Sequence, residues 1–234
     1  MPIRAVLFDW GGTLVRTLPA PPASAYAAVA HYARRHLYLA LRDEVFELAC
    51  QEATAGMDPG TSVPVATLLN AAFERLGWSI DDADIAACSR LFFTEATAVD
   101  TVFDDARALL ASLKFRGFRI AVVADSPFPG EMYTDLLAEV GLTGYLDSFV
   151  TSADVARQKP APDAYLRALA TVRVDPHEAL FVGDTVETDI AGARAAGLRA
   201  VLVDRAGRHR EGAGYLVIER LSALGQLLGE GTVA

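Results

Sequence analysis

The sequence predicts an α/β protein with a doubly wound parallel sheet and an all-helical module inserted after the first strand. Residues 1–18 and 99–234 alternate short β-branched runs with helical patterns, which is the order that strand–helix–strand units produce. Residues 19–98 contain helical patterns and no strand-like run. We therefore expect two domains: a discontinuous core made of residues 1–18 and 99–234, and a helical domain made of residues 19–98.

Five runs have the composition of strands that are covered on both faces. They are apolar nearly throughout, whereas a strand with one solvated face alternates apolar and polar residues. The runs are Ile3–Phe8, Arg119–Val123, Ser148–Val150, Ala179–Val182 and Arg199–Val203. Helical patterns lie between them, near residues 104–115, 130–140, 162–172 and 187–196. Three of these patterns end at a glycine, as helix C-caps often do: Gly117, Gly141 and Gly197.

The inserted module is punctuated by proline and glycine. Pro19, Pro21 and Pro22 mark its start, and the Gly56–Pro64 stretch interrupts it. Helical patterns rich in alanine and leucine occupy residues near 23–39, 42–55, 65–77 and 81–97. Because the sheet pattern resumes after the last of these, the core domain is expected to assemble from two separate parts of the sequence.

Composition and charge exclude several classes of protein. The 234 residues are 52% hydrophobic and 22% charged, which rules out a disordered chain. The net charge of −9 repels phosphodiester backbones and anionic lipids, so neither nucleic acid nor a membrane surface is an expected partner. No apolar run has the length of a membrane span, and no signal peptide is recognised, which favours a cytoplasmic protein. Cys50 and Cys88 lack metal-ligand spacing and are expected to be buried free thiols.

Polar side chains gather where the predicted strands end. In an open parallel sheet, ligands bind in the crevice at the carboxyl ends of the strands. Four strand-like runs are followed there by carboxylates, a hydroxyl and a lysine. The residues are Asp9, Asp125, Ser126, Lys159, Asp184 and Asp189. This convergence points to a functional site more strongly than any one of the residues does.

Two of these residues also have ordinary structural interpretations. Asp184 could cap a helix, with Glu187 three residues later completing a capping box. Lys159 could be a solvated loop residue. However, the chain contains only two lysines, Lys114 and Lys159, and uses arginine elsewhere. A compact ammonium group is therefore expected to matter at position 159.

The loop after the first strand and the acidic residues together predict a phosphate and metal site. Gly11 and Gly12 allow the backbone to approach a phosphate group closely and to present its amides. Asp9, Asp184 and Asp189 offer hard oxygen ligands of the kind that Mg²⁺ prefers, together with phosphate and water. We expect Mg²⁺ to be the cofactor.

Three segments carry a resemblance to a known family. Asp9–Leu14 resembles the motif D-x-D-G-T-L, Lys159–Tyr165 resembles K-P-x-P-x-x-F/Y, and Gly183–Ala193 resembles G-D-x-x-x-D-h-x-G-A. These are motifs of the haloacid dehalogenase-like hydrolase superfamily, and in particular of its small phosphatases of the phosphoglycolate phosphatase type. The resemblance covers essentially the whole chain. It implies a Rossmann-like core with a helical cap inserted just after the first motif, where the helical module lies here.

The resemblance also implies roles for individual residues. Asp9 would be the nucleophile that accepts the phosphoryl group as an aspartyl-phosphate. Asp9, Asp184, Asp189 and the carbonyl of Gly11 would hold Mg²⁺, with Asp189 acting through water or by orienting Lys159. Lys159 would be the second catalytic residue, because it neutralises charge between Asp9 and the phosphoryl oxygens. The substrate would be a small phosphorylated metabolite. The expected substrate-binding residues are Trp10, Gly11, Gly12, Arg16, Asp125 and Ser126.

Two positions depart from the family pattern. Gly11 stands where the phosphatases have a second aspartate, the general acid and base of the reaction. Ala124 stands where a serine or threonine normally donates a hydrogen bond to the phosphoryl group. Ser126 could supply that hydroxyl, and Asp125 could supply a carboxylate. We therefore expect an activity that is weak or selective for the leaving group.

Other members of the superfamily provide three alternatives. Phosphonatases have a similar D-W-A-G-T motif but use a cap lysine, and residues 19–98 contain none. Dehalogenases have tyrosine at the position of Gly11 and need no Mg²⁺, so Asp184 and Asp189 argue against them. The main alternative is a catalytically degenerate protein that binds phosphate or regulates a partner.

Overall fold

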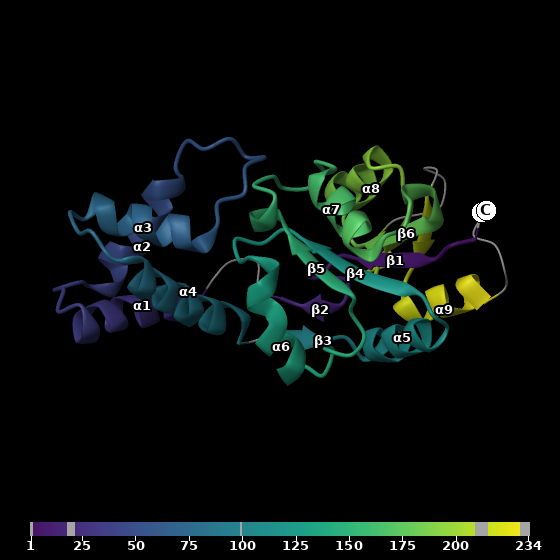
Figure 1. Cartoon of the computed structure of the whole chain (residues 1–234), viewed down its shortest axis with the longest axis horizontal. Coiled ribbons are helices and arrows are strands. Elements are labelled where there is room, and N and C mark those ends of the chain that lie inside the picture. Colours follow the sequence, from purple (N-terminus) through teal and green to yellow (C-terminus); the bar gives the residue numbers. More distant parts are fainter. Residues whose placement is uncertain (1, 18–21, 99, 209–214, 230–234) are drawn as a thin grey trace. The chain divides into compact units, whose positions relative to one another are not determined.

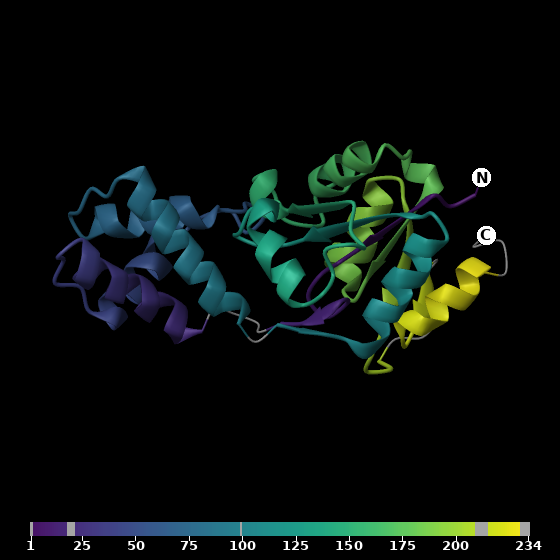
Figure 2. The ribbon, with the colours of Figure 1, turned by 60° about the horizontal axis from the view of Figure 1, so that its bottom comes forward.

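The computed structural model describes residues 2–17, 22–98, 100–208 and 215–229. The chain divides into two compact units (Figures 1 and 2). One unit is made of Met1–Arg16 and Thr101–Ala234, and the other of Thr17–Asp100. The first unit contains the sheet.

Among the described residues, the main sheet has six strands, all paired in parallel, in the order β5-β4-β1-β6-β7-β8. Their bounds are β1 Ala5–Phe8, β4 Arg119–Ala124, β5 Ser148–Thr151, β6 Ala179–Gly183, β7 Arg199–Val203 and β8 Leu216–Ile218. From β1 the chain builds outward through β4 and β5, then returns to the other side of β1 and builds outward through β6, β7 and β8. The strand order therefore reverses at β1, the switch point at which such sheets bind ligands. The predicted doubly wound parallel sheet is confirmed.

Helices cover both faces of this sheet (Figures 1 and 2). Helices α7 (Asp163–Val172) and α8 (Ala191–Ala195) lie on one face, and α5 (Asp104–Phe115) and α9 (Leu221–Gly229) lie on the other. Ala5 and Leu7 of β1 belong to the same core cluster as Tyr165 and Leu169 of α7. All four residues of β1 are fully buried, because alternate side chains enter opposite helical layers. The strand is therefore apolar throughout.

Several boundaries differ from the expectation. A two-stranded ribbon, β2 (Val15–Arg16) with β3 (Thr101–Val102), and the edge strand β8 were not predicted. The helix expected at 187–196 begins as a π-helix over Val186–Ile190 before α8. The capping-box interpretation of Asp184 is wrong, because the N-cap of this segment is Thr185 and its side chain makes no cap hydrogen bond.

The glycines expected at helix ends are confirmed in that role. Gly117, Gly141 and Gly197 have φ values of 83°, 69° and 84°, and each lies two residues beyond the last residue of α5, α6 (Tyr133–Glu139) or α8. A left-handed conformation there ends the helix without steric strain in glycine. Short 3₁₀ turns occupy Gly130–Met132, Ser152–Asp154 and Pro176–Glu178.

The second unit contains four helices and no strand among its described residues. They are α1 (Ala23–His36), α2 (Asp43–Thr54), α3 (Val65–Arg75) and α4 (Asp82–Thr97). Aromatic contacts join them in pairs, between Phe46 of α2 and Phe73 of α3 with ring centroids 4.9 Å apart, and between Tyr26 of α1 and Phe92 of α4 at 5.0 Å. Cys50 and Cys88 are buried free thiols, as expected. No helix in the described part of the chain is long and apolar enough to cross a membrane.

Candidate active site

The register of the sheet brings the ends of three strands together around Asp9. Phe8, the last residue of β1, pairs with Val122 of β4 and with Val182 of β6. Asp9 follows immediately, and its backbone N–H donates to the carbonyl of Val182 at 2.9 Å. Because all three strands run in the same direction, the residues that follow β4 and β6 lie at the same edge of the sheet.

Lys159 joins two of the expected acidic residues. Its Nζ donates to Oδ1 of Asp9 at 2.5 Å and to Oδ1 of Asp189 at 2.6 Å. The side chains of Lys159, Asp9 and Asp189 are only 5%, 8% and 1% exposed. The backbone N–H of Lys159 also donates to Oδ1 of the exposed Asp125 at 2.9 Å. A buried ammonium group therefore holds the carboxylate of Asp9 in one orientation.

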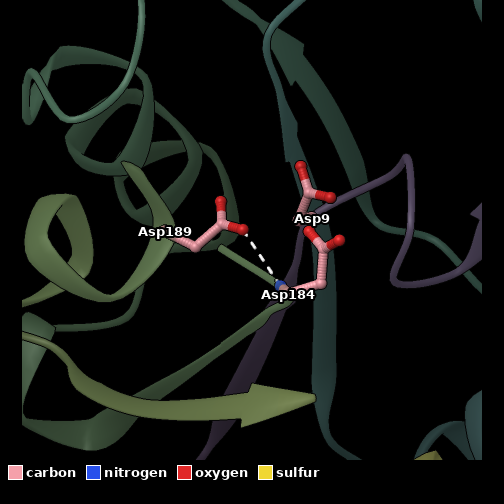
Figure 3. Close-up of side chains that lie close together, drawn as sticks. All are labelled: Asp9, Asp184 and Asp189. Carbon is pink, nitrogen blue, oxygen red and sulfur yellow. Dashed lines mark hydrogen bonds between the residues drawn. The ribbon is translucent and has the colours of Figure 1, made fainter. Parts of the chain in front are cut away.

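Asp189 uses both of its carboxylate oxygens. Oδ1 accepts from Lys159, and Oδ2 accepts from the backbone amides of Asp184 and Thr185, each at 3.0 Å. Figure 3 shows the bond to Asp184 as a dashed line. A Cβ atom at Gly183 would lie 2.4 Å from Cγ of Asp189, so only glycine fits at the end of β6. Asp189 thus fixes both Lys159 and the turn that carries Asp184.

The carboxylates of Asp9, Asp184 and Asp189 form one acidic cluster. Each residue offers an oxygen, and these oxygens lie within 4.8 Å of one another. In Figure 3 the carboxylates of Asp9 and Asp184 lie next to each other, with that of Asp189 to one side. Gly12 has φ +79°, and a Cβ atom there would lie 2.2 Å from Oδ2 of Asp184. The loop that follows Asp9, residues Trp10–Leu14, is called the first-motif loop below. It packs against the acidic cluster so closely that position 12 requires glycine.

One lysine does not neutralise the cluster. Burial raises the pKa of Asp9 to about 7; Lys159 opposes this shift, while the charges of Asp189 and Asp184 add to it. Burial and the charge of Asp189 also raise the pKa of Asp184. Burial alone would lower the pKa of Lys159, but Asp9 and Asp189 outweigh it and raise that pKa. The remaining repulsion between carboxylates favours the binding of a cation, and hard oxygen donors suit a divalent one.

The end of β4 carries different chemistry. Ala124 is buried and offers no polar side chain. The hydroxyl of Ser126 lies 2.9 Å from the hydroxyl of Tyr133 and accepts from the backbone N–H of Phe128 at 3.0 Å. The backbone N–H of Ser126 donates to Oγ of Ser152 at 2.9 Å. Ser126 thus shapes the turn after β4, and its role in binding substrate stays a prediction.

Two further residues expected to bind substrate lie in packing contacts. Trp10 is 3% exposed and meets Tyr133 and Phe149 edge-on, with ring centroids 5.9 and 5.1 Å away. Cζ of the exposed Arg16 lies 5.4 Å from the ring centroid of Phe103. Trp10 thus packs the loop after Asp9 against Tyr133 of α6 and Phe149 of β5. For both residues, contact with substrate stays a prediction.

Two supporting residues were not identified as such from the sequence. The hydroxyl of Tyr165 donates to the carbonyls of Thr188 and Asp189 at 3.1 and 3.4 Å, which links α7 to the π-helical turn. Tyr165 is the last residue of the segment that resembles K-P-x-P-x-x-F/Y, and this position in the sequence could have identified it as a supporting residue. Arg205 donates to the carbonyls of Gly12 and Thr13. It belongs to none of the three motifs.

Comparisons with known proteins agree with the motifs. The family described as haloacid dehalogenase-like hydrolase matches residues 3–197. A phosphoglycolate phosphatase of Cupriavidus necator is 31% identical over 87% of this chain and 81% of its own length. One from Cereibacter sphaeroides is 32% identical over 87% and 86%. A crystal structure described as a 2-haloacid dehalogenase from Pseudomonas syringae superposes with a TM-score of 0.74 over 98% of this chain and all of that one, at 24% identity, which shows the shared fold alone.

The motifs, the fold and the relatives of this chain point to the same family. The three motifs meet at the switch point of the sheet, and the family match spans most of the chain. The two phosphoglycolate phosphatases named above are more than 30% identical to this chain over more than four fifths of their own length, which agrees with a phosphatase activity. The chain belongs to the haloacid dehalogenase-like hydrolase family.

Proposed function

We propose that this protein is a Mg²⁺-dependent phosphatase that hydrolyses a small phosphorylated metabolite by way of an aspartyl-phosphate on Asp9. The observation that carries the proposal is the buried Lys159 ammonium bound to both Asp9 and Asp189. It supplies an oriented carboxylate and a fixed positive charge at one point. The phosphatase relatives support a phosphate monoester as the substrate class.

The chain's own residues account for the first chemical step. The carboxylate of Asp9 attacks phosphorus, a bond from its oxygen to phosphorus forms, and the bond to the leaving oxygen breaks. Lys159 favours the anionic form of the attacking carboxylate and adds positive charge beside the phosphoryl oxygens. Preorganised charge of this kind is the main requirement of phosphoryl transfer.

The acidic cluster fits a magnesium ion. Asp9 and Asp184 would be its main ligands, with the carbonyl of Gly11 as a further candidate. Asp189 has both oxygens engaged by Lys159 and by the amides of Asp184 and Thr185, so its contribution would be to orient Lys159 or to act through water. When bound, Mg²⁺ supplies positive charge for the phosphoryl oxygens.

Proton transfer is the part of the reaction that this chain does not provide in the usual way. Gly11 has no acid to protonate a leaving alkoxide and no base to activate the water that attacks the aspartyl-phosphate. Acyl and nitroaryl phosphates, whose leaving groups depart without a proton, should therefore react much faster than alkyl phosphates. Asp125 is the first candidate for a substitute acid, because it is exposed and bonded to the backbone of Lys159.

We also propose that the helical unit is a cap that determines the choice of substrate. Its sequence leaves the core after β2 and returns at β3, so it is inserted directly after the loop that follows Asp9.

A phosphate-binding protein without turnover is the second candidate. Gly11 and Ala124 both favour it, because the acid–base group and the phosphoryl-binding hydroxyl are missing together. Such a protein would bind Mg²⁺ and phosphate at the same residues and release no product.

A hydrolysis panel with and without Mg²⁺ tests the proposal. It compares acetyl phosphate, p-nitrophenyl phosphate, 2-phosphoglycolate and 2-chloropropionate. We expect Mg²⁺-dependent release of phosphate, fastest from the first two, and a Mg²⁺-dependent rise in thermal midpoint that Asp184→Asn abolishes. The matched control is Asp135→Asn, which removes an exposed carboxylate in α6. Binding of Mg²⁺ and phosphate without turnover would establish the second candidate, and halide release would establish a dehalogenase.

A further inference from the structure

Arg205 holds the backbone of the loop that follows Asp9. It lies two residues after the end of β7, and its side chain is 23% exposed. Its Nη2 donates to the carbonyl of Thr13 at 2.8 Å, and its Nε donates to the carbonyl of Gly12 at 3.3 Å. One guanidinium group therefore binds two consecutive carbonyls of the first-motif loop.

Asp105 fixes the direction of this guanidinium. Nη1 and Nη2 of Arg205 donate to Oδ2 and Oδ1 of Asp105 at 3.1 and 3.0 Å. Oδ2 of Asp105 also accepts from the backbone N–H of Leu221, at the start of α9. A bidentate pair of this geometry leaves the arginine little freedom to turn. The guanidinium is thus preorganised by α5 and α9 to receive the two carbonyls.

These contacts determine the shape of the loop. A peptide unit is planar, so a carbonyl held on one side fixes the N–H on the other. The Thr13–Leu14 peptide shows this directly, because its carbonyl accepts from Arg205 while its N–H donates to the carbonyl of Trp10 at 3.0 Å. The carbonyl of Trp10 also accepts from Val15 at 3.0 Å. Arg205 therefore supports the turn that begins at Trp10, the residue next to Asp9.

Arg205 also reaches the ribbon through which the chain enters and leaves the helical unit. Its Cζ lies 3.8 Å from the ring centroid of Phe103, the residue after β3. The backbone N–H of Phe103 donates to the carbonyl of Leu14 at 3.0 Å, and Val15 of β2 pairs with Val102 of β3. The guanidinium of Arg205 thus contacts both the loop after Asp9, through two carbonyls, and the end of the β2–β3 ribbon, through the ring of Phe103.

We propose that Arg205 is a positioning residue for phosphoryl transfer, which it serves by locking the Trp10–Leu14 loop, and with it Asp9, to the β2–β3 ribbon. This inference rests on the proposed phosphatase function. Lysine cannot replace the arginine, because one ammonium group cannot bind two carbonyls, a carboxylate and an aromatic face in the same geometry.

Arg116 provides a matched control for substitution of Arg205. Its guanidinium donates to the carbonyls of Leu228 and Gly225 at 2.5 and 3.4 Å, and its Cζ lies 5.0 Å from the ring centroid of Phe118. Arg116→Ala therefore also removes two carbonyl contacts and one aromatic contact, but next to α9. With Mg²⁺ and p-nitrophenyl phosphate, Arg205→Ala should lower kcat about tenfold to a hundredfold with little change in KM or in Mg²⁺ affinity. Arg116→Ala should leave kcat unchanged.

Trp10 gives a second readout that needs no turnover. The sequence contains two tryptophans, so in a Trp78→Phe background the emission comes from Trp10 alone. Trp10 is buried, and release of the loop should shift its emission to longer wavelength and increase its quenching by acrylamide. We expect this change in Arg205→Ala and not in Arg116→Ala. Arg205→Lys should lie between wild type and Arg205→Ala in both readouts, and it takes the place of the alanine variant if that variant does not fold.

The two readouts separate the possible results. Unchanged Trp10 quenching in the Arg205 variants would overturn the inference, whatever the activity. Equal kcat values in Arg205→Ala and Arg116→Ala would also overturn it, since Arg205 would then only stabilise the fold. If the wild type releases no phosphate from any substrate, the proposed function fails, and Trp10 emission still decides whether Arg205 holds the loop.

Discussion

Strands β4 and β6 pair with opposite edges of β1 in the same parallel register, and each ends beside Asp9. The turn after β6 carries Asp184 and Asp189, with Asp189 bound to Lys159 and to two backbone amides. Strand β4 ends at Ala124, and the turn after it carries Ser126, whose hydroxyl interacts with Tyr133 and with a nearby backbone N–H. The segment after β6 thus places two carboxylates in the acidic cluster. The segment after β4 contributes Asp125, which accepts from the backbone N–H of Lys159, while its serine hydroxyl stabilises the local turn.

This difference separates two parts of phosphoryl transfer that usually occur together. In the proposed mechanism, orientation of the nucleophile and the positive charge beside it would come from Lys159 and the acidic cluster, which the structure brings together. Proton transfer and hydrogen bonding to the phosphoryl group would depend on positions 11 and 124, which are glycine and alanine. We therefore expect substitutions in the charged part to abolish activity and substitutions on the β4 side to adjust it.

The largest expected effect is that of Asp9→Asn. The amide keeps the shape of the side chain but removes the anionic nucleophile, so turnover of p-nitrophenyl phosphate should fall by about 10⁴-fold or more. Steady-state kinetics on carefully purified protein measure this. Turnover above a few per cent of the wild-type rate would show that another group is the nucleophile.

Gly11→Asp should increase the turnover of alkyl phosphates. An acid at this position could protonate a leaving alkoxide, so 2-phosphoglycolate turnover should rise by up to about 10²–10⁴-fold, with a smaller change for p-nitrophenyl phosphate. The positive φ of the loop is at Gly12, and not at the substituted position. The ratio of the two rates is the quantity to measure. If wild type already cleaves both substrates equally fast, another residue supplies the proton, and Asp125→Asn should then remove the alkyl-phosphate activity.

Lys159→Met keeps most of the side-chain volume and removes the charge. Loss of one preorganised cation should reduce kcat about 10²–10³-fold. It also leaves Asp9 and Asp189 facing each other while buried, which should lower the free energy of unfolding without Mg²⁺ by about 3–5 kcal/mol. Chemical denaturation in EDTA tests the second part, and Lys114→Met, at a partly exposed ion pair with Asp147, is the control. Equal losses in the two variants would contradict the role of the buried triad.

The pH dependence of the free energy of unfolding should reveal the cost of burying the ionised Asp9 carboxylate. Its pKa is about 7 in the folded protein and 3.8 as the ordinary value, so between these pH values the folded state binds more protons than the unfolded state. Its contribution therefore lowers stability as pH rises through that range. In EDTA, Asp9→Asn should gain thermal midpoint relative to wild type as pH increases from 4 to 7. A difference that is constant with pH, as expected for the exposed Asp135→Asn, would refute this.

Ser126→Ala should have the smallest effect on activity. If its hydroxyl mainly shapes the turn after β4, kcat should change by less than about tenfold, and the thermal midpoint should fall because Tyr133 and Phe128 lose a partner. A larger loss of kcat with no loss of stability would instead assign the missing phosphoryl contact to Ser126.

The sequence predicted the parts of the fold that depend on burial of long apolar runs. Arg199–Val203 forms a strand over the expected residues, and four expected helices form the second unit with boundaries within three residues. Short elements had no periodic signal, so the two-residue strands of the β2–β3 ribbon and the edge strand β8 were missed. These elements are determined by pairing with distant segments.

In the candidate site, too, some features could be predicted from the sequence, and others depend on contacts between distant segments. The residues at strand ends could be predicted because parallel register brings them to one edge, and the structure brings Asp9, Asp184, Asp189 and Lys159 together there. The partner of the Ser126 hydroxyl and the two carbonyls bound by Arg205 could not be predicted. These contacts depend on side-chain directions that neither spacing nor composition records.

The position of β1 has a consequence for how the chain folds. Ala5 pairs with Arg119 and Ala179, so the strand that precedes Asp9 is synthesised before both of the strands that it pairs with. The four helices of the second unit are synthesised in between. Their folding shortens the loop that must close before β1 and β4 can pair, which reduces the entropy lost in that step. Folding of the insertion before the core closes therefore limits the entropic cost that the length of the insertion would otherwise add.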